Sequence, residues 1–160
     1  MFSKLLLTAS ALATIASAGT INVDNHCGFA LYLTSAFGSG NDGVHSLSAS
    51  SDHSWTGPIT NDKNEQHALT ISKSPDMSSP LQNVYNVANG ITYYSLSTIY
   101  GDPLKSEGFH LDSAGNGFDL DSPKGRQGDL EHAYTPSNPS GNGAVFTDST
   151  NSDFTLVLCL

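Results

Sequence analysis

The chain has 160 residues, with six Lys or Arg against fifteen Asp or Glu, which gives a formal net charge of −9. Such an acidic balance offers little to neutralise phosphate groups, so nucleic acid and anionic membrane surfaces are excluded as expected partners. The length fits one domain with a single hydrophobic core.

The first element along the chain is a secretory signal peptide, predicted over residues 1–18. A positively charged start precedes an apolar run at residues 5–15, and residues 16–18 form an A-x-A cleavage site. This run is shorter than the roughly 20 residues that a membrane span requires, so a membrane anchor is not expected. We expect the mature protein to begin at Gly19, to be secreted, and to form one domain over residues 19–160.

The mature sequence predicts short β-strands rather than helices. No apolar period of 3.6 residues is sustained, and Gly, Pro, Ser, Asn and Asp divide the chain into short pieces. Alternating apolar residues predict strands over residues 20–24 and 29–34, which we interpret as a hairpin that turns at residues 25–28. The Gly-, Ser- and Asn-rich residues 35–52 predict a long exposed loop.

The middle of the chain predicts further strands over residues 54–56, 68–72, 81–87, 91–99 and 109–111. Asn89-Gly90 separates two of them and is the strongest hairpin signal in the sequence. The single tryptophan, Trp55, is expected to fill the core rather than to act as a ligand platform, because its large apolar area favours burial.

Residues 112–153 are rich in loop formers and predict a surface excursion or a lid. This segment contains the acidic pairs Asp119-x-Asp121 and Asp129-x-Glu131. They lack the twelve-residue calcium loop with its terminal Glu, so we interpret them as solvated loop acids. The six histidines are scattered without metal-binding spacing. We therefore predict neither a metal nor a cofactor.

The two cysteines, Cys27 and Cys159, lie near the ends of the mature chain. Cys159 directly follows a strong strand predicted over residues 154–158. In an oxidising compartment, two cysteines in a small secreted domain most often pair with each other. We predict one disulfide that joins the last strand to the first turn, with free or intermolecular thiols as the alternative.

Two segments resemble the thaumatin-like superfamily. Residues 20–32 resemble the opening of those proteins, in which a strand ends at Asn25-His26-Cys27 and the next strand begins with an aromatic residue. Residues 89–103 are similar to their second signature, a tyrosine-containing strand that runs into the loop Gly101-Asp102-Pro103. The length, this loop and the ending Leu156-Val157-Leu158-Cys159 resemble most closely the fungal Blastomyces yeast-phase-specific (Bys) family. The resemblance implies an all-β, thaumatin-like β-sandwich of short antiparallel strands with long loops.

The resemblance also implies an alternative enzymatic function. Plant members with glucan-degrading activity carry an acidic cleft, and Asp102 lies close to the place of one cleft aspartate, although Ser95 replaces the usual Asp of the preceding strand. Glycoside hydrolysis requires two carboxylates roughly 5 to 9 Å apart. Asp102 and Glu107 are therefore the catalytic candidates of a weak endo-β-1,3-glucanase.

Tyrosines supply the chemistry of a binding protein, because their rings stack on sugars. Alternation along a strand places Tyr93 and Tyr94 on opposite faces, so one is expected in the core and the other at the surface. Tyr94, Tyr100 and Asp102 are the ligand-binding candidates. We predict a monomeric, non-enzymatic interaction protein, antigen- or effector-like, that binds β-glucan, another cell-surface polysaccharide or a host protein. A structural cell-wall protein is the third hypothesis.

Overall fold

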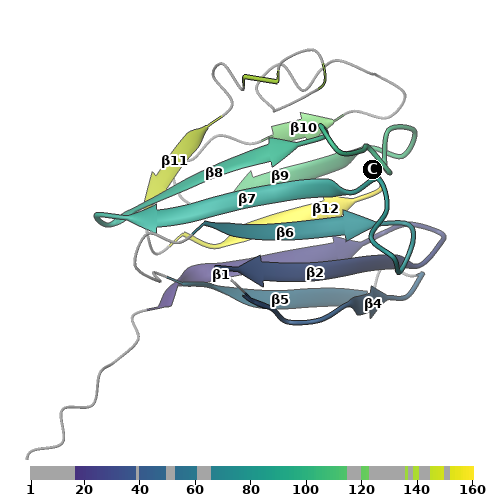
Figure 1. Cartoon of the computed structure of the whole chain (residues 1–160), viewed down its shortest axis with the longest axis horizontal. Helices are drawn as coiled ribbons and strands as arrows, with labels where there is room; N and C mark the ends of the chain where they lie inside the picture. The colour runs from purple at the N-terminus through teal and green to yellow at the C-terminus, as the bar shows by residue number, and fades with distance from the viewer. Residues whose placement is uncertain are drawn as a thin grey trace, which may run out of the picture.

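The computed structural model describes residues 17–38, 40–49, 53–60, 66–114, 120–122, 136, 139–140, 145–149 and 152–160. These residues contain strands and no helix, and the strands form two sheets that lie face to face (Figure 1). The strands are β1 (Ser17–Asn25), β2 (Leu31–Phe37), β3 (Gly40–Asn41), β4 (His45–Leu47), β5 (His53–Thr60), β6 (His67–Ser72), β7 (Leu81–Ala88), β8 (Ile91–Ser97), β9 (Phe109–Ser113), β10 (Leu120–Ser122), β11 (Phe146–Ser149) and β12 (Phe154–Leu158).

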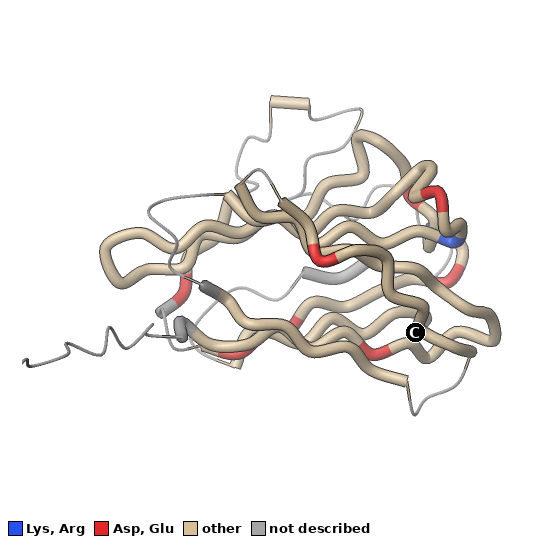
Figure 2. Tube along the Cα trace, turned by 60° about the horizontal axis from the view of Figure 1, so that its bottom comes forward, with Lys and Arg blue, Asp and Glu red and all other residues tan. Residues whose placement is uncertain are grey.

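The smaller sheet has five strands in the order β10-β9-β12-β1-β5. The larger sheet has the order β11-β8-β7-β6-β2-β3, with β4 also paired to β2. Neighbouring strands are antiparallel except β1 and β12, which pair in parallel from Ile21 to Asn25 and from Phe154 to Leu158. The predicted all-β sandwich is confirmed, and Figure 2 shows the same two layers from another side.

The core lies between the sheets because the inward-facing residues of the strands are apolar. Buried and partly exposed residues alternate along β2, β7 and β12, as a strand with one covered face requires. Leu33 of the larger sheet and Leu156 of the smaller sheet are both completely buried. Each strand predicted in the mature chain is present, with its ends shifted by a few residues.

The predicted hairpin of residues 20–34 is wrong, because β1 and β2 belong to different sheets. The turn between them carries the chain from one layer to the other, and the completely buried side chain of Asn25 holds the crossing. Its Nδ2 atom lies 3.1 Å from the carbonyl oxygens of Phe29 and Leu47, and 2.9 Å from that of Ser48. Its Oδ1 atom accepts a hydrogen bond of 2.9 Å from the Cys27 N–H. A buried amide therefore replaces the expected turn hydrogen bonds.

The predicted loop over residues 35–52 is also corrected, since residues 35–37, 40–41 and 45–47 belong to the larger sheet. β2 extends to Phe37, and β3 and β4 fold back to pair with it. The Asp42 carboxylate stabilises this return, because its Oδ1 atom accepts a 2.7 Å hydrogen bond from the Ser35 N–H. By contrast, the Asn89-Gly90 hairpin is confirmed. Both residues have positive φ, 54° and 78°, as a tight two-residue turn requires.

The structure confirms the disulfide between Cys27 and Cys159, which are 132 residues apart in sequence. The chain end is held further by backbone hydrogen bonds from the Cys159 N–H to the Gly108 oxygen and from the Leu160 N–H to the Glu107 oxygen, at 2.9 and 3.1 Å. The last strand, the first turn and the segment before β9 therefore meet at one corner. In the part of the chain that the structure describes, no helix is long and apolar enough to cross a membrane.

Candidate functional site

The tyrosine pair of β8 is divided between the core and the surface. Tyr94 is 2 % exposed, and its ring packs against Phe154 at 4.8 Å and Phe146 at 5.7 Å between centroids. Tyr94 is therefore packed in the core, although it also contributes to the lining of the groove described below, and its role as a ligand candidate stays a prediction. Tyr93 lies on the opposite face of the strand and is half-buried. The surface tyrosine of this strand is Tyr93.

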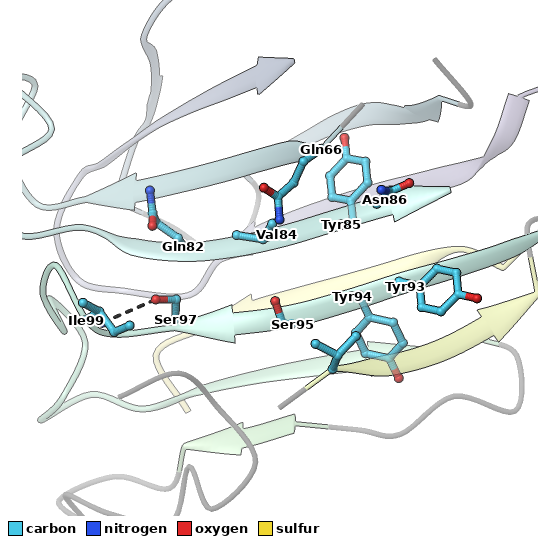
Figure 3. A pocket seen from close by; sticks show the side chains of 11 residues that line it. Gln66, Gln82, Val84, Tyr85, Asn86, Tyr93, Tyr94, Ser95, Ser97 and Ile99 are labelled. Carbon is cyan, nitrogen blue, oxygen red and sulfur yellow. Dashed lines mark hydrogen bonds between the residues drawn. The ribbon is translucent and has the colours of Figure 1, made fainter. Parts of the chain in front are cut away.

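Tyr93 borders a groove of about 320 Å³ on the outer face of the larger sheet (Figure 3). The groove runs over the outward-facing residues of β7 and β8, which are neighbours in the sheet. Polar lining residues with amide, phenol or hydroxyl groups are Gln66, Gln82, Asn86, Tyr93, Ser95 and Ser97. The core tyrosines Tyr85 and Tyr94 also contribute to the lining. Ser95 and Ser97 are 6 % and 7 % exposed. These two serines therefore form the floor, while the amides and the ring form the walls.

The groove also has apolar lining residues. Ile99 and Val145 are among them and are 38 % and 51 % exposed. The Ile99 N–H is fixed by a 3.4 Å hydrogen bond to Ser97 Oγ. The groove therefore combines hydrogen-bond donors and acceptors with apolar contact surface.

None of the described residues that line the groove is charged. Amide side chains both donate and accept hydrogen bonds, and a tyrosine adds an aromatic face and a hydroxyl. This combination suits a neutral ligand rich in hydroxyl groups. Sequence reasoning missed the amides of β7, although Gln82 and Asn86 stand in the polar register of a strict alternation. That register shows which residues share a face, but not whether the face is hollowed.

The predicted candidates Tyr100 and Asp102 lie in the segment between β8 and β9, and neither lines the groove. Tyr100 is 69 % exposed. Asp102 is partly buried, and its Oδ1 atom is buried without a hydrogen-bond partner. Burial raises the pKa of the Asp102 carboxyl, and the nearby charge of Glu107 adds to this effect. Asp102 therefore holds its proton to higher pH than an ordinary aspartate.

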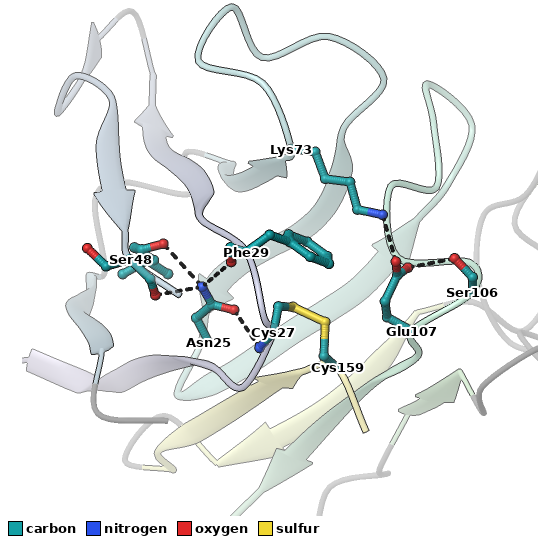
Figure 4. Close-up of a disulfide and its surroundings, with 9 residues drawn as sticks. Asn25, Cys27, Phe29, Ser48, Lys73, Ser106, Glu107 and Cys159 are labelled. Carbon is teal, nitrogen blue, oxygen red and sulfur yellow. Dashed lines mark hydrogen bonds and ion pairs between the residues drawn. A yellow bond between two sulfur atoms is a disulfide. The ribbon is translucent and has the colours of Figure 1, made fainter. Parts of the chain in front are cut away.

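Glu107, the other catalytic candidate, is occupied by two partners. Its Oε1 atom lies 2.9 Å from Lys73 Nζ, and its Oε2 atom accepts a 2.9 Å hydrogen bond from the Ser106 hydroxyl (Figure 4). Partial burial alone would raise the pKa of Glu107, but these hydrogen bonds outweigh it and lower the pKa. Lys73 also lies 4.7 Å from the centre of the Phe29 ring, beside the disulfide. The ion pair of Lys73 and Glu107 therefore stabilises the corner of the fold that holds the disulfide.

Acidic residues outnumber basic residues in the described part of the chain (Figure 2). In the described ranges the basic residues are Lys73 and Lys105, whereas acidic residues occur on both sheets and in their connections. The acidic pairs predicted between residues 119 and 131 fall outside the described residues, apart from the backbone of Asp121 in β10. Within the described part of the chain, no group of three or more His, Cys, Asp or Glu side chains is placed to hold a metal ion.

Comparison with protein families identifies a family for this chain. The family model described as Blastomyces yeast-phase-specific protein matches residues 8–160, which is nearly the whole chain. This confirms the resemblance read from the two sequence segments. No curated protein gives a significant match.

Two solved structures illustrate the fold. The protein elicitor MoHrip2 from Magnaporthe oryzae is 19 % identical, with a TM-score of 0.73 over 89 % of this chain and 99 % of its own. The thaumatin-like xylanase inhibitor TLXI is 12 % identical, with a TM-score of 0.58 over 88 % of this chain and 99 % of its own. At these identities the likeness shows a shared thaumatin-like fold. It assigns no ligand.

Proposed function

We propose that this chain, which belongs to the Blastomyces yeast-phase-specific family, is an extracellular recognition protein that binds a neutral cell-wall polysaccharide such as β-glucan through the groove over β7 and β8. Both structural neighbours, an elicitor and an enzyme inhibitor by their names, suggest a role in interaction. The polysaccharide and the groove are our own inference from its chemistry.

The observation that carries the proposal is an uncharged, amide-lined groove on an acidic protein. The sequence has a net charge of −9, yet the described lining of the groove contains no acid or base. A charged protein partner would leave its charges without counterparts there, at a desolvation cost. A sugar chain carries hydroxyl groups that exchange hydrogen bonds with amides, and C–H faces that pack on the Tyr93 ring.

Secretion is part of the proposal. It is supported by the predicted signal peptide and by the disulfide, a bond that persists in oxidising compartments. Cleavage after residue 18 would remove the single pair of Ser17 with Thr60 and leave the continuous pairing of β1 with β5 from Thr20 and with β12 from Ile21. Intact mass of the secreted protein, with a mature start at Gly19 expected, tests this part. A mass that retains residues 1–18 would contradict it.

The binding test is co-sedimentation of the mature protein with insoluble β-1,3-glucan, chitin and cellulose. We expect saturable binding to one of these polymers, and weakening by roughly five- to tenfold in Tyr93→Ala, which removes the aromatic wall. Tyr32→Ala is the matched control, because Tyr32 is a half-buried tyrosine on the outer face of β2 in the same sheet, and does not line the groove.

Salt dependence separates this mechanism from electrostatic binding. Because the groove is uncharged, the affinity should change less than about twofold between low and high salt. Equal losses in Tyr93→Ala and Tyr32→Ala, or binding that disappears in salt, would contradict the groove assignment. No binding to any of the polymers would overturn the polysaccharide and direct the search to protein partners.

A second function is favoured by one observation, the opposite pKa shifts of Asp102 and Glu107. One carboxyl with a raised pKa and a second with a lowered pKa is the pattern of a general acid and its partner in glycoside hydrolysis. Sugar release from β-1,3-glucan, measured in the same tubes, tests it. Release that is lost in Asp102→Asn and in Glu107→Gln, but not in the exposed control Asp112→Asn, would establish a glucanase.

A further inference from the structure

A second hollow, of about 240 Å³, opens between the two sheets, and Tyr85 lines both this hollow and the groove. Four aromatic or imidazole rings from four strands line it: Phe37 of β2, Trp55 of β5, His67 of β6 and Tyr85 of β7. All four residues stand in the inward registers of their strands. His67 and Tyr85 are 2 % and 3 % exposed, whereas Phe37 is 42 % exposed. The rings therefore extend from the core to an open mouth.

The rings are held in place by their surroundings. His67 stacks on Tyr85 with 5.0 Å between centroids and an interplanar angle of 6°, and Phe37 lies 6.3 Å from His67. On the facing sheet, the Trp55 indole lies over Gly57, where a Cβ atom would come within 2.2 Å of the ring. Any larger residue at position 57 would displace Trp55. Because Gly57 has no side chain, the Trp55 indole can lie along β5 and form one wall of the hollow.

One carboxylate belongs to this hollow, that of Asp42. Its Oδ1 atom accepts the Ser35 N–H, and its Oδ2 atom lies 2.8 Å from Nε2 of His45, whose ring is 6.1 Å from the Trp55 ring. The carboxylate is therefore fixed beside the rings rather than free in solvent. None of the described lining residues is Lys or Arg.

This lining disfavours a sugar as the ligand. A sugar ring presents several hydroxyl groups, and each one buried without a partner is costly. The rings and Pro58 offer few hydrogen bonds, the Tyr85 hydroxyl is directed at the Pro58 oxygen at 3.5 Å, and both Asp42 oxygens already have partners. A ligand that needs no hydrogen bonds fits this lining better.

We propose that the hollow between the sheets binds a quaternary trimethylammonium group, held among the rings of Phe37, Trp55 and Tyr85 and by the Asp42 carboxylate. Such a group has no N–H to satisfy, and its positive charge is attracted both by aromatic faces and by a carboxylate. The net negative charge of the chain acts in the same direction.

The single tryptophan makes the test direct, because Trp55 lines the hollow and is the only Trp in the chain. The mature protein is titrated with choline while tryptophan fluorescence is recorded, with 3,3-dimethyl-1-butanol as the uncharged ligand of the same shape. We expect saturation by choline and binding of the neutral alcohol that is at least roughly tenfold weaker. Isothermal calorimetry provides a readout that does not depend on Trp55.

Two variants locate the site. Phe37→Ala removes a half-exposed ring at the mouth, and Asp42→Asn removes the charge, and each is expected to weaken choline binding by roughly threefold to tenfold. Asp24→Asn is the matched control, because Asp24 lies on the outer face of β1, away from the hollow. Circular dichroism melting checks that each variant is folded before its affinity is compared.

The outcomes are distinct. Equal affinities for choline and the neutral alcohol would show an apolar cavity without charge selection and overturn the proposal. A change in Trp55 fluorescence with glucose oligomers but not with choline would also overturn the proposal. So would a titration in which choline does not saturate the signal up to about 50 mM. Phosphocholine, trimethyl-lysine peptides and phosphatidylcholine vesicles carry the same group, so comparing them with choline separates a soluble source from a protein tail or a lipid surface. Because Tyr93 is not part of this hollow, failure here leaves the polysaccharide proposal untouched.

Discussion

Removal of the disulfide should cost much of the stability of this domain. In the chain-entropy model the stabilisation by a cross-link grows with the logarithm of the loop that it closes. Cys27 and Cys159 are 132 residues apart, which corresponds to about 5 kcal/mol at 25 °C. For a domain of this size, unfolding entropy near the midpoint is on the order of 0.3 kcal/mol/K, so the melting temperature should fall by about 15 °C.

The assay is urea unfolding of three samples: the wild type, the wild type with dithiothreitol, and the double variant C27S/C159S. The reduced protein and the double variant should lose similar free energies of unfolding, because both act on the unfolded chain. The slope of free energy against urea should rise, since an open chain exposes more surface. A loss below about 1 kcal/mol in both samples would refute the loop-entropy reasoning.

Three further changes test individual contacts. Gly101→Ala should lower the free energy of unfolding by about 1–3 kcal/mol, measured by thermal or urea unfolding, because a Cβ atom there would lie 2.2 Å from the Ser79 backbone. The control Gly28→Ala should be close to neutral, because the space around Gly28 is open. Asp102→Asn should stabilise the protein at neutral pH but not near pH 3. Burial raises the pKa of Asp102 in the folded state above the ordinary value of 3.8, so the wild type loses stability as the pH rises above that value. Melting temperatures of the wild type and the variant that differ equally at every pH would contradict this reasoning. Asn83→Leu should leave stability unchanged or raise it by about 1 kcal/mol, because the buried Nδ2 atom of Asn83 has no partner, and a clear loss in urea unfolding would contradict this.

Much of the secondary structure was predictable because it depends on local patterns. Alternation of apolar and polar residues located the strands, and Asn89-Gly90 located a hairpin, since that turn requires two positive φ angles that Asn and Gly tolerate. The cysteine pair was predictable for a different reason. With only two cysteines in the chain, an oxidising compartment leaves few alternatives.

The partners of the strands were not predictable from these patterns. The segments on either side of Cys27 alternate like two arms of a hairpin, but Asn25 takes the place of turn hydrogen bonds with contacts to Leu47 and Ser48, more than twenty residues away. That buried amide sends β2 into the other sheet. The parallel pairing of β1 with β12 likewise joins the two ends of the mature chain.

The sequence by itself predicted most of the strands, the disulfide and the family resemblance, because periodicity, turn chemistry and cysteine number are properties of short segments or of the whole count. It did not predict the short strands β3, β4, β10 and β11. Only the tertiary structure decided that Tyr94 is buried while Tyr93 is half-buried on the outer face, and that Phe37, Trp55 and Tyr85 gather around one hollow. The physical reason is that a period of two assigns residues to opposite faces of a strand, whereas the face that becomes buried is chosen by long-range packing of the sheets.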